Sequence, residues 1–128
     1  YETYGYITGM YFANQLGLTT QMPAIVEIVT NKEATNGRTI TVGNQKVRIK
    51  KSPIIVSDNN VKLLQFLDGV SQVEKYTELS MIETIDRMQS YIKVMNFTKA
   101  QLSEVSSKLT GTTAKKIIEW GMIYEFKL

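Results

Sequence analysis

The stretch "NQLGLTTQMPAIVEIVTNK", residues 14–32, marks the point where this chain is expected to change from helix to strand. Apolar residues before it recur at helical spacing, which predicts a short helix over residues 7–16 with Thr8 as its N-cap. Gly17 is suited to the left-handed conformation that ends many helices, and Pro23 prevents the helix from continuing. The expected local structure is therefore a helix end followed directly by the start of a strand.

The strand itself is expected over residues 24–30. This segment is rich in β-branched residues, and Glu27 is the one charge inside it. A nearly continuous apolar run is typical of a strand that is buried on both faces. We therefore place this strand at the centre of its sheet.

A β-hairpin is predicted downstream, with strands at residues 39–42 and 45–50 joined by a primed turn at Gly43-Asn44. With that turn, the alternation of side chains places Ile40, Val42, Val47 and Ile49 on one face, and Lys46, Arg48 and Lys50 on the other beside Thr39 and Thr41. A lone hairpin is only marginally stable. We therefore expect the aliphatic face to pack against the other strand and the helices, and the cations to point outward.

The remaining segments predict mostly helices. Residues 53–56 are expected to form an edge strand, and an amphipathic helix with the sequence "LLQFLDGV" follows Ser57-Asp58. Helices over residues 81–95 and 99–109 each begin with a capping box, Gly111 ends the second of them, a short helix begins at Thr112 or Thr113 and runs to Trp120, and a closing strand is expected over residues 122–126. The predicted fold is α/β (α+β), a single domain over residues 1–128 with a small mixed sheet packed by about five helices.

Composition limits the chemistry that this chain can perform. The 128 residues include no cysteine and no histidine, which excludes disulfides, thiolate nucleophiles, imidazole bases and metal sites built from these ligands. The longest apolar runs are far shorter than the roughly 18 residues of a spanning helix, so we expect a soluble, cytoplasmic protein that contacts no membrane. An enzyme built from this chain would have to use carboxylates, lysine, tyrosine or a bound ion.

Positive charge is concentrated around the predicted hairpin. Residues 32–51 hold six basic side chains against Glu33 alone, while the whole chain has a net charge of +3. The candidate nucleic-acid-binding residues are Arg38, Lys46, Arg48, Lys50 and Lys51. If four cations contact phosphates, the log-log slope of DNA affinity against salt should be roughly 3 to 4. The alternative, given equal weight, is a solvated sheet edge whose charges prevent aggregation.

Other candidate sites are weaker. "TGTTAKK", residues 110–116, resembles an anion-binding loop but lacks a second glycine and a preceding strand, so a helix stop followed by an N-cap is preferred. Glu27 could act with a metal ion, but an ordinary ion pair is preferred. The acidic segment of residues 68–86 could bind a basic protein, although a solvated helix surface is preferred. We predict no catalytic residue, no metal site and no cofactor.

The opening segment "YGYITGMYFANQLGLTTQMPAIVEIVTNK" resembles the start of the C-terminal domain of AbiEi-type antitoxins, regulators of bacterial abortive-infection type IV toxin-antitoxin systems. The matching positions are Tyr6, Thr8 and Gly9 before the helix, Gly17, Leu18, Thr19, Gln21 and Pro23 in the turn, and Thr30 at the strand end. The segments "VRIKKSP", "LLQFLDGV" and "TAKKIIEWGMIYEF" also look like this family, so the resemblance covers nearly the whole chain.

The resemblance implies a transcriptional regulator and antitoxin, not an enzyme, that opposes a nucleotidyltransferase toxin. In that family the domain usually follows an N-terminal winged helix, which is missing here. Because the chain begins with Tyr1, we expect it to be the C-terminal domain of a longer protein. Operator DNA is a possible partner. The alternatives are a protein-interaction module without nucleic-acid binding and, less favoured, an enzyme that uses Glu27 and an ion.

Overall fold

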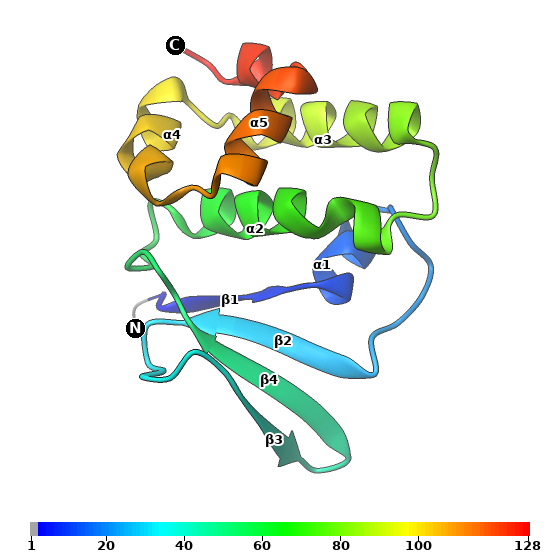
Figure 1. Cartoon of the computed structure of the whole chain (residues 1–128), viewed down its shortest axis with the longest axis vertical. Coiled ribbons are helices and arrows are strands. Elements are labelled where there is room, and N and C mark those ends of the chain that lie inside the picture. Colours follow the sequence, from blue (N-terminus) through cyan, green and yellow to red (C-terminus); the bar gives the residue numbers. More distant parts are fainter. Residues whose placement is uncertain (1–2) are drawn as a thin grey trace.

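The structure is a computed structural model that describes residues 3–128 (Figure 1). Its strands are β1 (Gly5–Thr8), β2 (Ile25–Thr30), β3 (Arg38–Val42) and β4 (Gln45–Lys51). Its α-helices are α1 (Met10–Gln15), α2 (Val61–Tyr76), α3 (Met81–Met95), α4 (Lys99–Val105) and α5 (Gly111–Glu119), with 3-10 turns at η1 (Ser106–Lys108) and η2 (Met122–Glu125).

The four strands form one mixed sheet in the order β1-β2-β4-β3. β2 pairs antiparallel with β1 and parallel with β4, and β3 pairs antiparallel with β4. The predicted fold class, a small mixed sheet packed by helices, is confirmed. The interior position of β2 is also confirmed.

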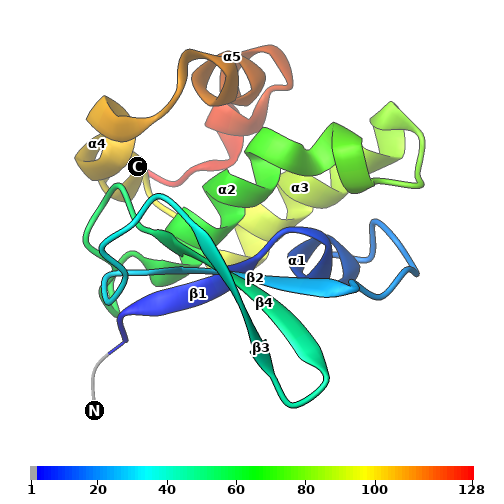
Figure 2. The same ribbon diagram turned by 60° about the horizontal axis from the view of Figure 1, so that its bottom comes forward.

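The helices cover only one face of the sheet. α1 and α2 lie on that face, and α3 and α5 form a further layer beyond α2 (Figures 1 and 2). α2 is therefore enclosed between layers, and its consecutive residues 63–67 are all buried. At its centre, Phe66 is fully buried and stacks on Tyr91 of α3 with ring centroids 5.3 Å apart. The main hydrophobic core thus lies around α2.

The helix end at Gly17 forms as predicted. Gly17 has a φ of 74°, and the amides of Gly17 and Leu18 donate to the carbonyls of Asn14 and Ala13. These two bonds make a Schellman motif, and they bury Leu18 in the core. Glu78, between α2 and α3, fixes the junction further, because the Thr19 hydroxyl donates to its carboxylate and lowers its pKa. The distinctive turn is therefore a structural anchor between α1 and the α2–α3 connection.

Three predicted elements are wrong. The helix expected over residues 7–16 begins only at Met10, because residues 5–8 pair with β2 as a strand, and Thr8 is therefore not an N-cap. Residues 53–56 form no strand: the side chain of Asn31 makes hydrogen bonds with both the amide and the carbonyl of Val56, where a neighbouring strand would otherwise pair. Residues 122–125 form a 3-10 turn after Gly121, whose φ is 68°.

The helix boundaries were predicted more accurately. α3 spans the predicted residues, and the Thr98–Gln101 capping box forms with both reciprocal hydrogen bonds. Ser80 caps α3 by accepting from the amide of Glu83. Gly111 was predicted to end the helix that begins at residue 99, and this is wrong. Gly111 is the first residue of α5, and Thr110 is the N-cap of that helix. A side-chain cap before α5 was expected, and the structure places it two or three residues earlier.

Candidate functional site

The β3–β4 hairpin has the predicted register. Val42 faces Gln45, Thr41 faces Lys46, Ile40 faces Val47 and Thr39 faces Arg48. Gly43 has a φ of 61°, and Asn44 is not among the residues with positive φ. These signs match a type II′ turn, in which glycine takes the first central position. The division into one aliphatic and one basic face is therefore confirmed.

The predicted orientation of these two faces is wrong. Lys46, Arg48 and Lys50 share their face of the sheet with Tyr6 and Glu27. Both of these residues reach α2, because Tyr6 donates to Asp68 and Tyr76 donates to Glu27, each over 3.4 Å. The basic residues therefore lie on the face that the helices cover. β2 is likewise covered by helices on one face only, not on both.

The aliphatic residues form the outer face of the sheet. Ile7, Ile28 and Ile49 are neighbours in register across β1, β2 and β4. None of the three is among the residues that pack against the main core. Val47, flanked in register by Val26 and Ile40, is only 8% exposed. We call this surface, made by Ile7, Val26, Ile28, Ile40, Val42, Val47 and Ile49, the outer aliphatic face.

The hairpin extends past the helices. Among residues 3–128, α1 packs on β1 and β2 and α2 packs on β1, whereas β3 makes extensive contacts only with β4. Figure 2 shows β3 and the hairpin turn projecting away from the helical layers. Lys46 is exposed and Arg48 half-buried, although both are on the helix side. The Arg48 guanidinium lies against Gly37, so closely that a Cβ added to this glycine would be 2.7 Å from Nη2 of Arg48.

The five candidate cations do not form one continuous stripe. Lys46 and Arg48 are alternate residues on the same face of β4, with Lys46 nearer the turn, while Lys50 lies 4.0 Å from Glu27 and faces the helices. Register places Arg38 and Lys51 on the opposite face. The Arg38 guanidinium donates to Glu33 over 2.6 Å, and this hydrogen bond lowers the pKa of Glu33. Lys46 and Arg48 are therefore the cations best placed to meet a common ligand on the hairpin.

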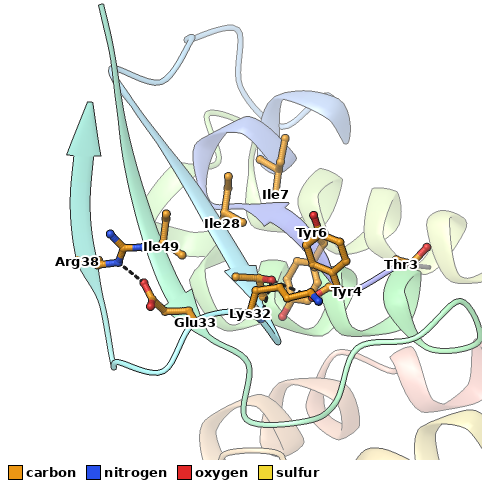
Figure 3. Close-up of a pocket in the computed structure, with 11 residues that line it drawn as sticks. Thr3, Tyr4, Tyr6, Ile7, Ile28, Lys32, Glu33, Arg38 and Ile49 are labelled. Atoms are coloured by element: carbon orange, nitrogen blue, oxygen red, sulfur yellow. Dashed lines mark hydrogen bonds and ion pairs between the residues drawn. The ribbon is translucent and has the colours of Figure 1, made fainter. Parts of the chain in front are cut away.

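A groove on the outer face was not foreseen from the sequence. Its volume is about 550 Å³, and the register row of Ile7, Ile28 and Ile49 lies along it (Figure 3). Lys32 lies over the Tyr4 ring, 5.1 Å from its centroid, and the Glu33–Arg38 ion pair also lines the groove. Because β1 supplies part of this wall, the groove could not be predicted without that strand.

A covered carboxylate lies between the sheet and α2. Burial raises the pKa of Asp68, against the opposing effects of the nearby Thr8 hydroxyl and the Lys50 charge. Burial and the neighbouring Asp68 also raise the pKa of Tyr6. Thr8 Oγ1 is buried and makes no hydrogen bond of ordinary geometry with the described residues of the chain. The Tyr6–Asp68 pair thus links β1 to α2 within a polar patch at the edge of the core.

The other candidate sites have structural partners. Lys116 donates to Glu74 and to the carbonyls of Val70 and Ser71, and Lys115 lies 3.8 Å from Glu119. Both lysines of "TGTTAKK" therefore point to acidic or carbonyl oxygens of the chain itself. Glu27, the candidate ion ligand, lies near Lys50 and accepts from Tyr76. Among residues 3–128, no three acidic side chains gather closely enough to hold a metal ion.

No helix of the described chain is long and apolar enough to cross a membrane. Comparisons with protein-family models, with curated proteins and with solved structures found no match.

Proposed function

We propose that this chain is an antitoxin-like regulatory domain of the AbiEi type, which contacts operator DNA through its hairpin and opposes a nucleotidyltransferase toxin. The observation that carries the DNA contact is the projecting hairpin (Figure 2), on which Lys46 and Arg48 stand opposite Thr41 and Thr39. The family resemblance supplies the antitoxin role. The Schellman turn at Gly17 gives the resembling residues a structural role that any member with this fold would need.

A two-stranded ribbon is narrow enough to enter the major groove of DNA. The two cations would contact phosphates, and the threonine hydroxyls would be additional donors. Because Lys50 and Arg38 have acidic neighbours, fewer phosphate contacts are expected than from the sequence alone. Two contacts give a log-log salt slope of about 2, from about 0.9 per phosphate.

The DNA contact is tested with a labelled duplex from the region upstream of the chain's own reading frame. The Lys46→Glu/Arg48→Glu double variant should bind at least about tenfold more weakly at low salt, with a smaller salt slope. The matched control is Lys62→Glu/Lys99→Glu, which makes the same change in net charge at exposed positions on α2 and α4. Equal affinity for the hairpin variant and the unaltered chain, or equal losses in both variants, would remove the hairpin from the interface.

The antitoxin role has a separate test. The reading frame adjacent to that of this chain is first searched for a nucleotidyltransferase. Co-expression of the chain with that enzyme should restore growth that the toxin alone prevents. A catalytically inactive toxin is the control for the burden of expression. Continued growth arrest, with the chain present and folded in the same cells, would contradict an antitoxin role for this domain acting alone.

A second candidate, a protein-interaction module without nucleic-acid binding, is favoured by the outer aliphatic face and its groove. An open sheet face of this kind is a surface that proteins commonly bury against a partner. Ile28 lines the groove and lies between Ile7 and Ile49 in the register row. If this candidate holds, Ile28→Glu abolishes the growth rescue, and the unaltered chain shows no salt-dependent retention of DNA.

A further inference from the structure

The outer edge of β3 is an open hydrogen-bonding edge of the sheet. β3 is the last strand in the sheet order, and within the described part of the chain its extensive contacts are with β4 alone. In a two-residue hairpin the residues flanking the turn form a hydrogen-bonded pair, and such pairs alternate along an antiparallel ladder. Ile40 therefore bonds to β4, while the backbone N–H and C=O groups of Thr39 and Thr41 point away from it. These groups are available to another extended strand.

The side chains along this edge differ in chemistry between the two faces. On the outer side, Ile40 and the 61%-exposed Val42 continue the outer aliphatic face to the edge of the sheet. On the helix side stand the short side chains of Thr39 and Thr41, with Lys46 and Arg48 immediately behind them on β4. The Arg48 guanidinium lies against Gly37, immediately before β3, so this long side chain extends from β4 toward the chain of the edge strand. Positive charge is thus carried close to the free edge.

We propose that the β3 edge binds an extended segment of a partner protein in which acidic and aliphatic residues alternate. Such a segment would add a fifth strand, with its backbone bonded to Thr39 and Thr41. Its acidic side chains would reach Lys46 and Arg48 over the threonines, and its aliphatic side chains would extend the row of Ile40 and Val42. This inference goes beyond the proposed function and requires neither DNA binding nor antitoxin activity.

Charge argues against a second copy of this chain as the occupant. Antiparallel pairing of two β3 strands about Ile40 would bring the Lys46 and Arg48 of both copies to the same face of a joined sheet. Like charges placed in this way oppose association. β3 itself also carries Arg38 and no acidic residue. An acidic strand removes this repulsion and replaces it with attraction.

The probe is a synthetic peptide of about eight residues with strictly alternating Glu and Val, the length of an ordinary strand. Two control peptides are used: one has the same composition in separate blocks of Glu and of Val, and the other has Lys in place of Glu. Binding is followed by two-dimensional NMR of the whole chain. Only the alternating acidic peptide should bind, and the amides of Thr39 and Thr41 should gain protection from hydrogen exchange while that of Ile40 changes little.

Thr41→Pro tests the backbone contact directly. Proline removes the N–H that points to the free edge and leaves the β3–β4 bonds in place, which edge strands tolerate. Peptide affinity should fall at least about tenfold for Thr41→Pro and change less than about threefold for Thr41→Val. The NMR spectrum of each free variant establishes that the hairpin is still folded. If Thr41→Pro unfolds the hairpin, the same peptide with alternate amides N-methylated applies the test to the unaltered chain.

The outcomes separate this inference from the DNA proposal. Loss of peptide binding with unchanged DNA affinity in Thr41→Pro supports the free edge as the peptide site. Equal binding of the alternating and the block peptide would reduce the effect to net charge and overturn the proposal. Concentration-dependent self-association of the unaltered chain that Thr41→Pro abolishes would make a second copy the occupant and would also overturn it.

Discussion

The half of the sheet under the helices and the hairpin beside it are built from similar strands but are buried very differently. In β2, Val29 and Thr30 are buried, and Glu27 contacts a side chain of α2, as Tyr6 of the neighbouring β1 also does. In β3, only Ile40 is even partly buried. The difference arises because α1 and α2 pack on β1 and β2, and the hairpin projects past them (Figure 1).

The two regions differ in which face of the sheet is covered, and side-chain alternation does not determine that. Alternation determines which residues share a face, and here it placed Lys46, Arg48 and Lys50 together correctly. It does not determine which face the helices cover. That choice depends on where the helices attach, and α1 follows β1 directly through Gly9. An aliphatic face can therefore remain open while a polar face is covered, provided that the polar groups find partners such as Asp68.

The largest expected effect on stability comes from placing a carboxylate on the covered face of β2 and not on its outer face. Val29→Asp buries a second carboxylate under α2, near Asp68, and should cost about 3 to 5 kcal/mol of unfolding free energy. Ile28→Asp, on the outer face, should cost about 1 kcal/mol. Urea unfolding monitored by circular dichroism measures both. Equal losses would mean that the outer face is covered in solution.

A smaller effect on stability is expected from alanine at the two glycine turns, one at the end of α1 and the other in the projecting hairpin. Gly17→Ala and Gly43→Ala each force a side chain into the left-handed region, at a cost of about 1 to 2 kcal/mol. At Gly17 the new Cβ would also displace the Arg87 guanidinium, whereas the space beside Gly43 is open. Gly17→Ala should lower global stability, and Gly43→Ala should mainly speed hydrogen exchange in β3 and β4. If Gly43→Ala speeds hydrogen exchange equally throughout the chain, the hairpin does not open separately from the rest of the fold.

Charge reversal along the basic face gives a smaller effect again. Lys50→Glu would place a third carboxylate near Glu27 and Asp68 and should cost about 1 kcal/mol. It should also raise the pKa of Asp68 further, because the Lys50 charge now lowers it. Lys46→Glu, near the exposed turn, should change stability by less than about 0.5 kcal/mol. The reverse ranking in urea unfolding would place Lys46, and not Lys50, under the helices.

The pH dependence of stability should have opposite signs for the two carboxylates that mark the two faces. The folded state raises the pKa of Asp68, chiefly through burial, so stability should fall as the pH rises from the ordinary value of 3.8 through the raised pKa. The folded state lowers the pKa of Glu33, chiefly through its hydrogen bond from Arg38. That contribution is present above about 4.5 and is lost as the pH falls through the lowered pKa.

Two single substitutions separate these contributions. Asp68→Asn should remove the decline of stability above pH 4, and Glu33→Gln should remove part of the loss at lower pH. Denaturant unfolding at a series of pH values measures both. A decline that persists unchanged in Asp68→Asn would assign it to another group.

Local signals allowed much of the fold to be predicted. The turn at Gly43-Asn44 fixed the hairpin register, and capping side chains at Ser80 and Thr98 marked two helix starts. β1 was missed because it is only four residues long and its pairing with β2 lies about twenty residues away in sequence. Its apolar residues also fit a helical spacing. The missing strand concealed the groove, whose wall includes Ile7.

The candidate site was predicted in composition but not in arrangement. The cations were identified, yet the ion pair of Arg38 with Glu33 and the proximity of Lys50 to Glu27 depend on which face and which loop they meet. Neither follows from charge counting. Lys46 and Arg48, on the ribbon that projects beyond the helices, remain candidate nucleic-acid-binding residues.

The parallel pairing of β2 with β4 has a consequence for the order of folding. β3 and β4 are adjacent in sequence, so their ribbon can close within microseconds once the turn forms. β2 can join β4 only after the intervening segment of residues 31–44 has looped back, which costs additional chain entropy. Contacts between distant residues form more slowly than local ones. The ribbon that is least covered in the finished protein is thus the part best able to form first, and β2, β1 and the helices then assemble on its inner edge.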